Sequence, residues 1–184
     1  MESNIKKSLW NNAGTAGLLL GLISTASMFI GQWMAVKELS AFATTAVGAL
    51  LWVAETGGCL YLMHFFMKKF SAMCPEADNR ATFRMGMATA FLSALVYSAA
   101  SFANLAFISA DFYDGQYAEI MQQMAPMMDS NTMGTMEKML ERMPQITFFS
   151  NLIYCFLFGT IAAAIMSRNI PSQDPFADYR PEEQ

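Results

Sequence analysis

Residues 41–66 read AFATTAVGALLWVAETGGCLYLMHFF, and the only Asp, Glu, Lys, Arg or His residues among them are Glu55 and His64. A helix that crosses the roughly 30 Å of hydrocarbon in a bilayer needs about 20 predominantly apolar residues, and this stretch is long enough. The alternation of apolar and polar residues that marks a barrel strand is absent. In lipid, backbone groups must also be satisfied within the segment, which favours a helix. The stretch therefore predicts a transmembrane helix.

The same character extends to Ala13–Met34, Gly86–Ala110 and Ile146–Met166, which contain no Asp, Glu, Lys, Arg or His. Charged residues make up only 14% of the chain, against about 25% in soluble domains, and hydrophobic residues make up 54%. We therefore expect an all-α, polytopic membrane helix bundle with four transmembrane helices. A chain of 184 residues fits one such domain, here residues 1–170.

Lysine and arginine residues predict the orientation of the bundle, because they are enriched on the cytoplasmic side. In a four-span arrangement, eight of them fall on one side and three on the other. The eight are Lys6, Lys7, Lys68, Lys69, Arg80, Arg84, Arg168 and Arg180, and the three are Lys37, Lys138 and Arg142. We therefore expect both termini in the cytoplasm and residues 111–145 outside. Residues 171–184, which combine three prolines with acidic residues, are predicted to be a disordered cytoplasmic tail.

The segment between the third and fourth spans, Asp111–Gln145, is rich in methionine at helical spacing. One apolar stripe covers residues 117–128, a second covers 133–143, and residues 129–131 form a capping turn between them. Pro126 is expected to kink or shorten the first helix. Two short amphipathic helices are therefore predicted. Their methionines would suit burial on the outer leaflet or the bundle, a partner-binding surface, or copper(I) capture by thioethers, and burial already explains the spacing.

Glu55 is the one acidic residue within the predicted spans. A carboxylate near the middle of a span costs at least about 2.5–3.5 kcal/mol on insertion scales, so it should face protein or a water-filled pocket. At a similar depth the third span carries Tyr97 and Ser98, which together with Glu55 form a candidate intramembrane polar site. The first span offers Ser24 and Thr25. Either Glu55 binds a proton or cation during transport or sensing, or it is a neutral acid hydrogen-bonded between helices.

Small residues at four-residue spacing mark the helix faces that are expected to pack closely. These pairs are Gly17/Gly21, Gly86/Ala90, Ala94/Ser98 and Gly159/Ala163. Gly57 and Gly58, next to Glu55, are also expected to let a neighbouring backbone come close.

The chain lacks the residue sets that most enzymes and cofactor-binding proteins need. His64 is its only histidine, and neither GxxxxGK[ST] nor GxGxxG occurs. Its three cysteines form no CxxC pair, and the net charge of −4 argues against nucleic acid as a partner. We therefore expect a non-enzymatic protein without catalytic residues, cofactor or metal site. Its expected partners are the lipid bilayer and either further copies of itself or another membrane protein.

Two functions fit these features. The first is an interaction or accessory subunit of the membrane, which the small-residue helix faces and the adaptable outer segment favour. The second is a small oligomeric transporter or channel, coupled to protons or cations through Glu55. Four spans can line a pathway only if copies of the chain associate.

A longer pattern begins in the third span, with Gly86-Met87, Phe91-Leu92-Ser93, Tyr97, Phe102 and Phe107-Ile108-Ser109-Ala110-Asp111-Phe112. It continues with Pro144 before the fourth span, Gly159 and Ala162-Ala163-Ala164 within it, Arg168 at its end and Pro175-Phe176 in the tail. In this layout the chain resembles the family catalogued as domain of unknown function 4199. It departs from the family in having Ala110 where a proline is common, and in having fewer lysines after the last span.

The resemblance implies a four-span inner-membrane protein of Gram-negative bacteria, in which residues 111–145 would be periplasmic. It implies no activity, cofactor or site residue.

Overall fold

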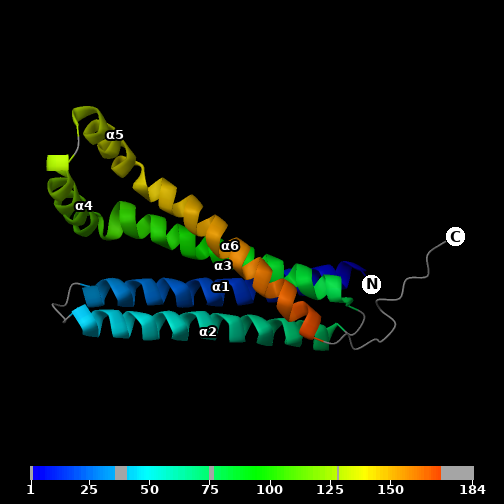
Figure 1. The fold of residues 1–184 in the computed structure, drawn as a ribbon. Coiled ribbons are helices and arrows are strands. Elements are labelled where there is room, and N and C mark those ends of the chain that lie inside the picture. The colour runs from blue at the N-terminus through cyan, green and yellow to red at the C-terminus, as the bar shows by residue number, and fades with distance from the viewer. Residues whose placement is uncertain (1, 36–40, 75–76, 128, 171–184) are drawn as a thin grey trace.

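The computed structural model describes residues 2–35, 41–74, 77–127 and 129–170, which are helical almost throughout (Figure 1). In chain order the elements are α1 (Glu2–Ala35), α2 (Ala41–Met73), α3 (Asn79–Ala103), a π-helical turn η1 (Asn104–Ile108), α4 (Ala110–Met124), a 3₁₀ turn η2 (Ala125–Met127), α5 (Ser130–Glu141) and α6 (Met143–Asn169). The predicted all-α fold is confirmed.

Four of these helices are long and apolar enough to cross a membrane, which confirms the four predicted spans. The candidate spans are Ile5–Ala35, Thr45–Met73, Asn79–Ile108 and Met143–Asn169. Each extends past the predicted apolar stretch at one end at least. The physical reason is that an apolar run stops at the edge of the hydrocarbon, whereas the helix itself continues into the interface, where long basic side chains can reach water.

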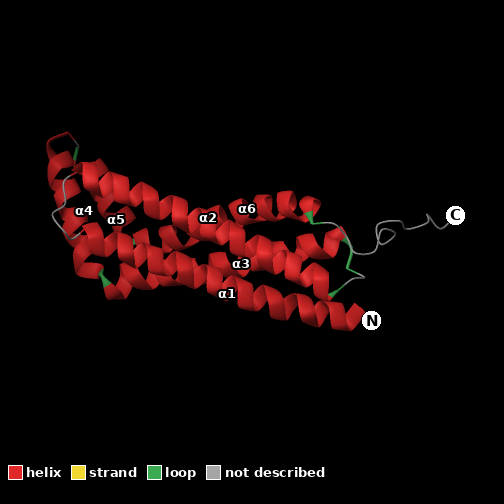
Figure 2. Cartoon of the chain, turned by 90° about the horizontal axis from the view of Figure 1, so that it is seen from below, coloured by secondary structure: helices red, strands yellow, loops and turns green. Residues whose placement is uncertain are grey.

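The third helix forms the centre of the bundle. α3 packs extensively along α1 on one side and along α6 on the other, whereas α2 packs mainly on α1 and touches α3 and α6 at few positions. Figures 1 and 2 show α1 and α2 lying side by side, with α6 crossing α3. In the most apolar 18-residue window of each helix, 6% of α2 is buried, against 28% of α1. Most of the surface of α2 is therefore left for lipid or for another protein.

Glycines set the short distance between α1 and α3. A Cβ atom added to Gly17 would lie 2.6 Å from Leu92 Cβ, and one added to Gly21 would lie 2.6 Å from Val96 Cβ. Because real Cβ atoms do not approach so closely, the two helices could not pack in this way with larger residues at either position. The predicted contact face at Gly17/Gly21 is confirmed.

The contact between α3 and α6 is built in the same way from small residues. A Cβ atom added to Gly86 would lie 2.8 Å from Ala163 Cβ, and one added to Gly159 would lie 2.6 Å from Ala90 Cβ. The two predicted pairs therefore face each other in antiparallel order along this contact. Such packing brings the helix backbones close together, which is the main source of helix association in lipid.

The segment between the last two spans forms two helices, as predicted. α4 ends at the 3₁₀ turn that contains Pro126, and α5 is capped by Asp129, whose Oδ1 accepts a hydrogen bond of 2.9 Å from the Thr132 backbone N–H. Figure 1 shows both helices at the end of the bundle opposite the start of α1. α4 has no fully buried residue, and the methionines of its stripe, Met121 and Met124, are half-buried, so the described chain covers this stripe only in part.

At the opposite end of the bundle, Asp78 caps α3 by accepting a hydrogen bond of 2.7 Å from the Ala81 backbone N–H. One predicted feature, the disordered tail at 171–184, lies outside the described residues.

Candidate functional site

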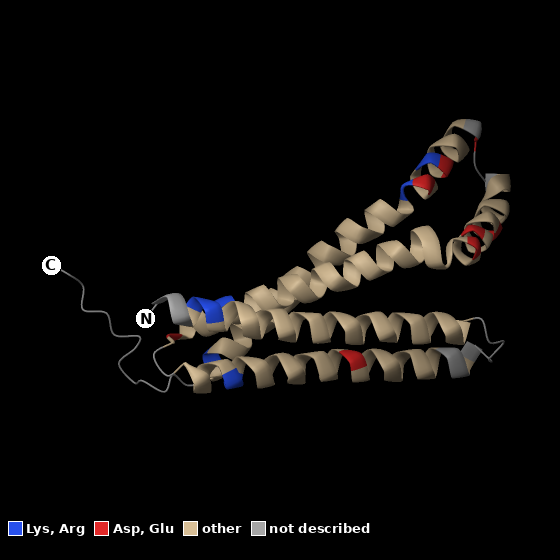
Figure 3. Cartoon of the chain, turned by 180° about the vertical axis from the view of Figure 1, so that it is seen from behind, with Lys and Arg blue, Asp and Glu red and all other residues tan. Residues whose placement is uncertain are grey.

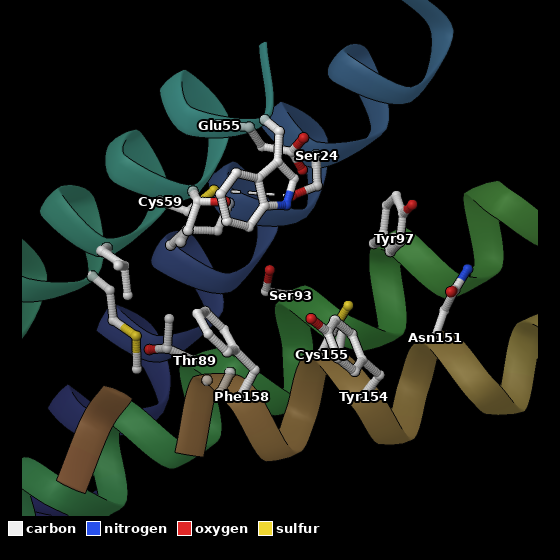
Figure 4. Close-up of a pocket in the computed structure, with 18 residues that line it drawn as sticks. Ser24, Glu55, Cys59, Thr89, Ser93, Tyr97, Asn151, Tyr154, Cys155 and Phe158 are labelled. Carbon is white, nitrogen blue, oxygen red and sulfur yellow. Dashed lines mark hydrogen bonds between the residues drawn. The ribbon is translucent and has the colours of Figure 1, made fainter. Parts of the chain in front are cut away.

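A cavity of about 320 Å³ lies within the membrane-spanning part of the bundle and is lined by all four long helices (Figure 4). Its lining is mostly apolar, but each of the four helices contributes at least one polar side chain. These include Ser24 from α1, Glu55 from α2, Tyr97 from α3 and Asn151 from α6. An apolar hollow of this size with a few converging polar groups is the common form of a ligand-binding or partner-binding site.

Glu55 lies half-buried on this cavity, on the same side as Ser24 and Cys59 (Figure 4). The Ser24 hydroxyl and the Cys59 thiol form a hydrogen bond of 3.9 Å, in which either group can be the donor. Within the described part of the chain, the Glu55 carboxyl group has no hydrogen-bond partner, and no Lys, Arg or His lines the cavity. The carboxyl group is therefore left for a proton, a ligand or a neighbouring protein.

The other two members of the predicted site have different places. Tyr97 lines the cavity with Glu55, but Ser98 does not. Ser98 is fully buried, and within the described residues its hydroxyl group has no hydrogen-bond partner. The reason is geometric, because successive residues on an α-helix point about 100° apart, so two neighbours at one depth face different surroundings. Thr25 likewise turns back on its own helix and donates a hydrogen bond of 2.8 Å to the Gly21 carbonyl oxygen.

The cavity opens between α2 and α6, which contact each other at few positions. Trp52 of α2 and Tyr154 of α6 line it while keeping 66% and 70% of their surface exposed, so they form the two edges of the opening. The expectation that Gly57 and Gly58 admit a neighbouring backbone is wrong for the single chain. Among the described residues, no atom of another helix lies within 4 Å of a Cβ added at either position, because these two positions face away from the other helices.

Several lining residues were not predicted, although a helical pattern in the sequence could have identified them. On α2 the lining residues are 52, 55, 56, 59, 60 and 63, and on α6 they are 151, 154, 155, 158 and 159. Both sets follow the i, i+3, i+4, i+7 spacing of a single helix face. Projecting each span around its axis from Glu55 and from Asn151 would have placed Cys59 and Cys155 beside them, rather than among ordinary apolar residues.

A bound cation would find limited charge in this site. Within the described chain, no group of three or more His, Cys, Asp and Glu side chains could hold a metal ion. Glu55 is the one carboxylate among the lining residues, and the other oxygen donors are neutral hydroxyl and amide groups. A site with one carboxylate is suited to a proton, a single cationic group or a hydrogen-bond donor rather than to a divalent metal, which needs several oxygen ligands.

Comparison with known proteins gives one match. No curated protein and no solved structure matches the chain. Residues 15–168 match a family model whose description is "Protein of unknown function (DUF4199)". The matched region contains every residue that lines the cavity, from Leu20 to Gly159. The resemblance read from the third span onward is thereby confirmed, and the chain belongs to the DUF4199 family.

Proposed function

We propose that this protein is a non-enzymatic interaction subunit of a bacterial inner membrane, and that it binds a transmembrane helix of a partner protein between α2 and α6. One observation carries the proposal: the cavity that opens there holds a carboxyl group, Glu55, with no hydrogen-bond partner among the described residues. A second copy of the chain is the competing occupant of the same opening.

The carboxyl group in the opening favours a protein helix over lipid as the occupant. Lipid tails can cover the exposed apolar side chains of α2, but they cannot hydrogen-bond to Glu55, and an unsatisfied carboxyl group in hydrocarbon is costly. A partner helix can supply a donor to Glu55 and pack against Trp52 and Tyr154 at the edges. Helices associate in lipid through such packing and interhelical hydrogen bonds rather than through a hydrophobic driving force.

The proposed orientation places both termini in the cytoplasm and residues 111–145 in the periplasm. The distribution of charge supports it, since the basic residues of α1 and α2 gather at one end of the bundle (Figure 3). The half-buried methionine stripe of α4 lies at the other end, where its uncovered part would be available to the periplasmic part of the same partner.

Site-specific photocrosslinking in native membranes tests the proposal. A benzophenone amino acid replaces Trp52 or Tyr154 at the opening, and Tyr61 serves as the control because it is equally exposed on α2 but does not line the cavity. We expect one protein adduct of discrete mass from positions 52 and 154 and none from position 61. Glu55→Leu should reduce this adduct strongly, and Glu55→Gln should reduce it less, because an amide still accepts a hydrogen bond. Lipid adducts alone at all three positions would refute the proposal.

A second candidate function is proton- or cation-coupled transport by an oligomer of this chain. The position of Glu55 favours it, because a carboxyl group in an intramembrane cavity without an opposite charge can take up and release a proton. In this case positions 52 and 154 would crosslink to a second copy of the chain. Proteoliposomes would show a proton-linked flux that Glu55→Gln abolishes, whereas persistence of the flux in that variant would exclude Glu55 as the coupling group.

A further inference from the structure

A second cavity, of about 440 Å³, lies between the start of α1 and the end of α2. It is lined by Lys7, Ser8, Asn11, Asn12 and Thr15 of α1 and by Lys69 and Met73 of α2. We propose that this cavity binds the phosphate group of an anionic phospholipid. The inference is independent of the cavity at Glu55, with which it shares no residue.

The donors in this cavity are available for an anion. Lys7 and Lys69 face it from two different helices, and within the described residues neither ammonium group has a carboxylate partner. The side-chain amide of Asn11 is likewise unengaged there. Two positive charges and an amide therefore converge on one hollow from which acidic side chains are absent among the lining residues.

Two of the remaining polar side chains, Asn12 and Thr15, already donate hydrogen bonds within α1. The Asn12 amide donates to the Ser8 carbonyl oxygen at 2.9 Å, and the Thr15 hydroxyl donates to the Asn11 carbonyl oxygen at 3.0 Å. Lys7, Asn11 and Thr15 lie four residues apart in turn, so they share one face of α1. Along this face, the charged group of Lys7 lies farthest from the apolar part of the helix, and the methyl group of Thr15 lies nearest to it.

The depth of the cavity matches that of lipid headgroups. Lys7 lies six residues before the apolar stretch that begins at Ala13, and Lys69 lies three residues after the stretch that ends at Phe66. At ~1.5 Å per residue these offsets are about 9 Å and about 5 Å along the helix axes. The headgroup layer extends a similar distance beyond the hydrocarbon, and basic pockets between helices at this level bind anionic headgroups. Trp10 stands between the lining residues Ser8 and Asn11 in the sequence. Its indole is exposed, as is common for tryptophans at the membrane interface.

The apolar side of the cavity distinguishes a lipid from a free anion. On the side nearer the hydrocarbon the cavity reaches Thr15, which is exposed and lies within the apolar stretch that begins at Ala13, so its methyl group offers a surface for the glycerol backbone and the first methylene groups of an acyl chain. A free phosphate ion would gain nothing from this surface, whereas a phospholipid places its charge on the lysines and its apolar part toward the bilayer.

Native mass spectrometry of the purified full chain in detergent provides the test. Phosphatidylglycerol and phosphatidylcholine with the same acyl chains are titrated separately against the wild type, Lys7→Gln/Lys69→Gln and Lys6→Gln/Lys68→Gln. The second variant is the matched control, because Lys6 and Lys68 are exposed neighbours that do not line the cavity and the two variants lose the same charge. We expect one phosphatidylglycerol to bind the wild type in preference to phosphatidylcholine. Its affinity should fall about 30-fold in Lys7→Gln/Lys69→Gln and stay within about 2-fold in the control.

Three results would overturn the inference. Equal losses in both double variants would mean diffuse attraction to a basic surface rather than a site. Equal binding of the two lipids would mean that the phosphate charge is not recognised. Displacement of phosphatidylglycerol by millimolar inorganic phosphate would assign the cavity to a free anion. If Lys7→Gln/Lys69→Gln does not fold, Lys7→Arg/Lys69→Arg and Asn11→Ala replace it, and we expect the first to keep lipid binding and the second to weaken it.

Discussion

The side-chain amide of Asn104 donates a hydrogen bond of 2.9 Å to Gln32 Oε1 and so joins the end of α3 to the end of α1. The same amide group reaches the Tyr113 hydroxyl oxygen of α4 at 3.3 Å, and Asn104 Oδ1 accepts a hydrogen bond of 2.9 Å from the Ser109 hydroxyl. Asn104 itself is fully buried at the first residue of the π-helical turn. This one side chain therefore connects α1, the end of α3 and the outer helix α4.

Replacing Asn104 by Leu should destabilise this end of the bundle. The change removes three hydrogen bonds and leaves half-buried polar partners unsatisfied, and we expect a loss of about 2 kcal/mol in the free energy of unfolding. Thermal unfolding in detergent measures the loss. Gln32→Leu completes a double-mutant cycle. The double variant should lose less free energy of unfolding than the two single variants together, because both single changes remove the same interhelical hydrogen bond. Strict additivity would show that the bond contributes nothing.

Hydrophobicity and capping signals in the sequence were sufficient to predict the spans and the two outer helices. The apolar stretches predicted the four long helices, and Pro126 and Asp129 indicated the boundary between α4 and α5. These features depend on local chemistry, since the hydrocarbon sets the length of a span and a cap is satisfied within one turn.

The arrangement of the helices around one another was predicted only in part. Depth in the membrane follows from position along a span, and Glu55 and Tyr97, which were expected at a similar depth, line the same cavity. The direction in which a side chain points depends on which helices touch, and no local signal gives that for Ser98 or Gly57. α3 packs extensively on α1 and α6 but touches α2 at few positions, so α2 lies at the edge of the bundle, which its sequence does not reveal.

Glycine replacements should separate packed from open positions. Gly21→Ala places a Cβ 2.6 Å from Val96 Cβ, and we expect it to cost about 1–3 kcal/mol through overpacking between α1 and α3. Gly57→Ala is the control, because its added methyl group meets nothing within 4 Å in the chain. That variant should be unchanged or more stable by about 0.5–1 kcal/mol, as for Gly→Ala in an unhindered helix. Thermal unfolding in detergent compares the two, and similar losses would show that the contact at Gly21 does not limit packing.

Two buried serines on α3 should respond differently to replacement by alanine. Ser101 accepts a hydrogen bond of 3.2 Å from the Asn151 side-chain amide of α6, so Ser101→Ala should cost about 0.6 kcal/mol. Ser98 has no hydrogen-bond partner among the described residues, so Ser98→Ala should be neutral or stabilising. Reversible unfolding in mixed micelles resolves such a difference. A larger loss for Ser98→Ala than for Ser101→Ala would point to a partner that Ser98 acquires only in the membrane or in a complex.

The N-terminal cap of α5 should make the outer segment sensitive to pH. Hydrogen bonds from Thr132, first from its side chain and then from its backbone N–H, hold the pKa of Asp129 below its ordinary value. A lowered carboxyl pKa means that the folded form binds its proton less readily than the unfolded form. The stabilisation is therefore complete above the ordinary carboxyl pKa of about 4 and is lost as the pH falls through the lowered one.

Hydrogen exchange followed by mass spectrometry tests this cap directly. In Asp129→Ala the amides of residues 131–133 should exchange several-fold faster at neutral pH, because the cap acceptor for the first turn of α5 is gone. Asp129→Ser should keep most of the protection and should remove the acid-dependent loss, since a hydroxyl group caps a helix without titrating. Protection that falls equally with pH in the wild type and in Asp129→Ser would show that another group controls α5. Unchanged exchange in Asp129→Ala would show that α5 is held by its contact with α6 rather than by the cap.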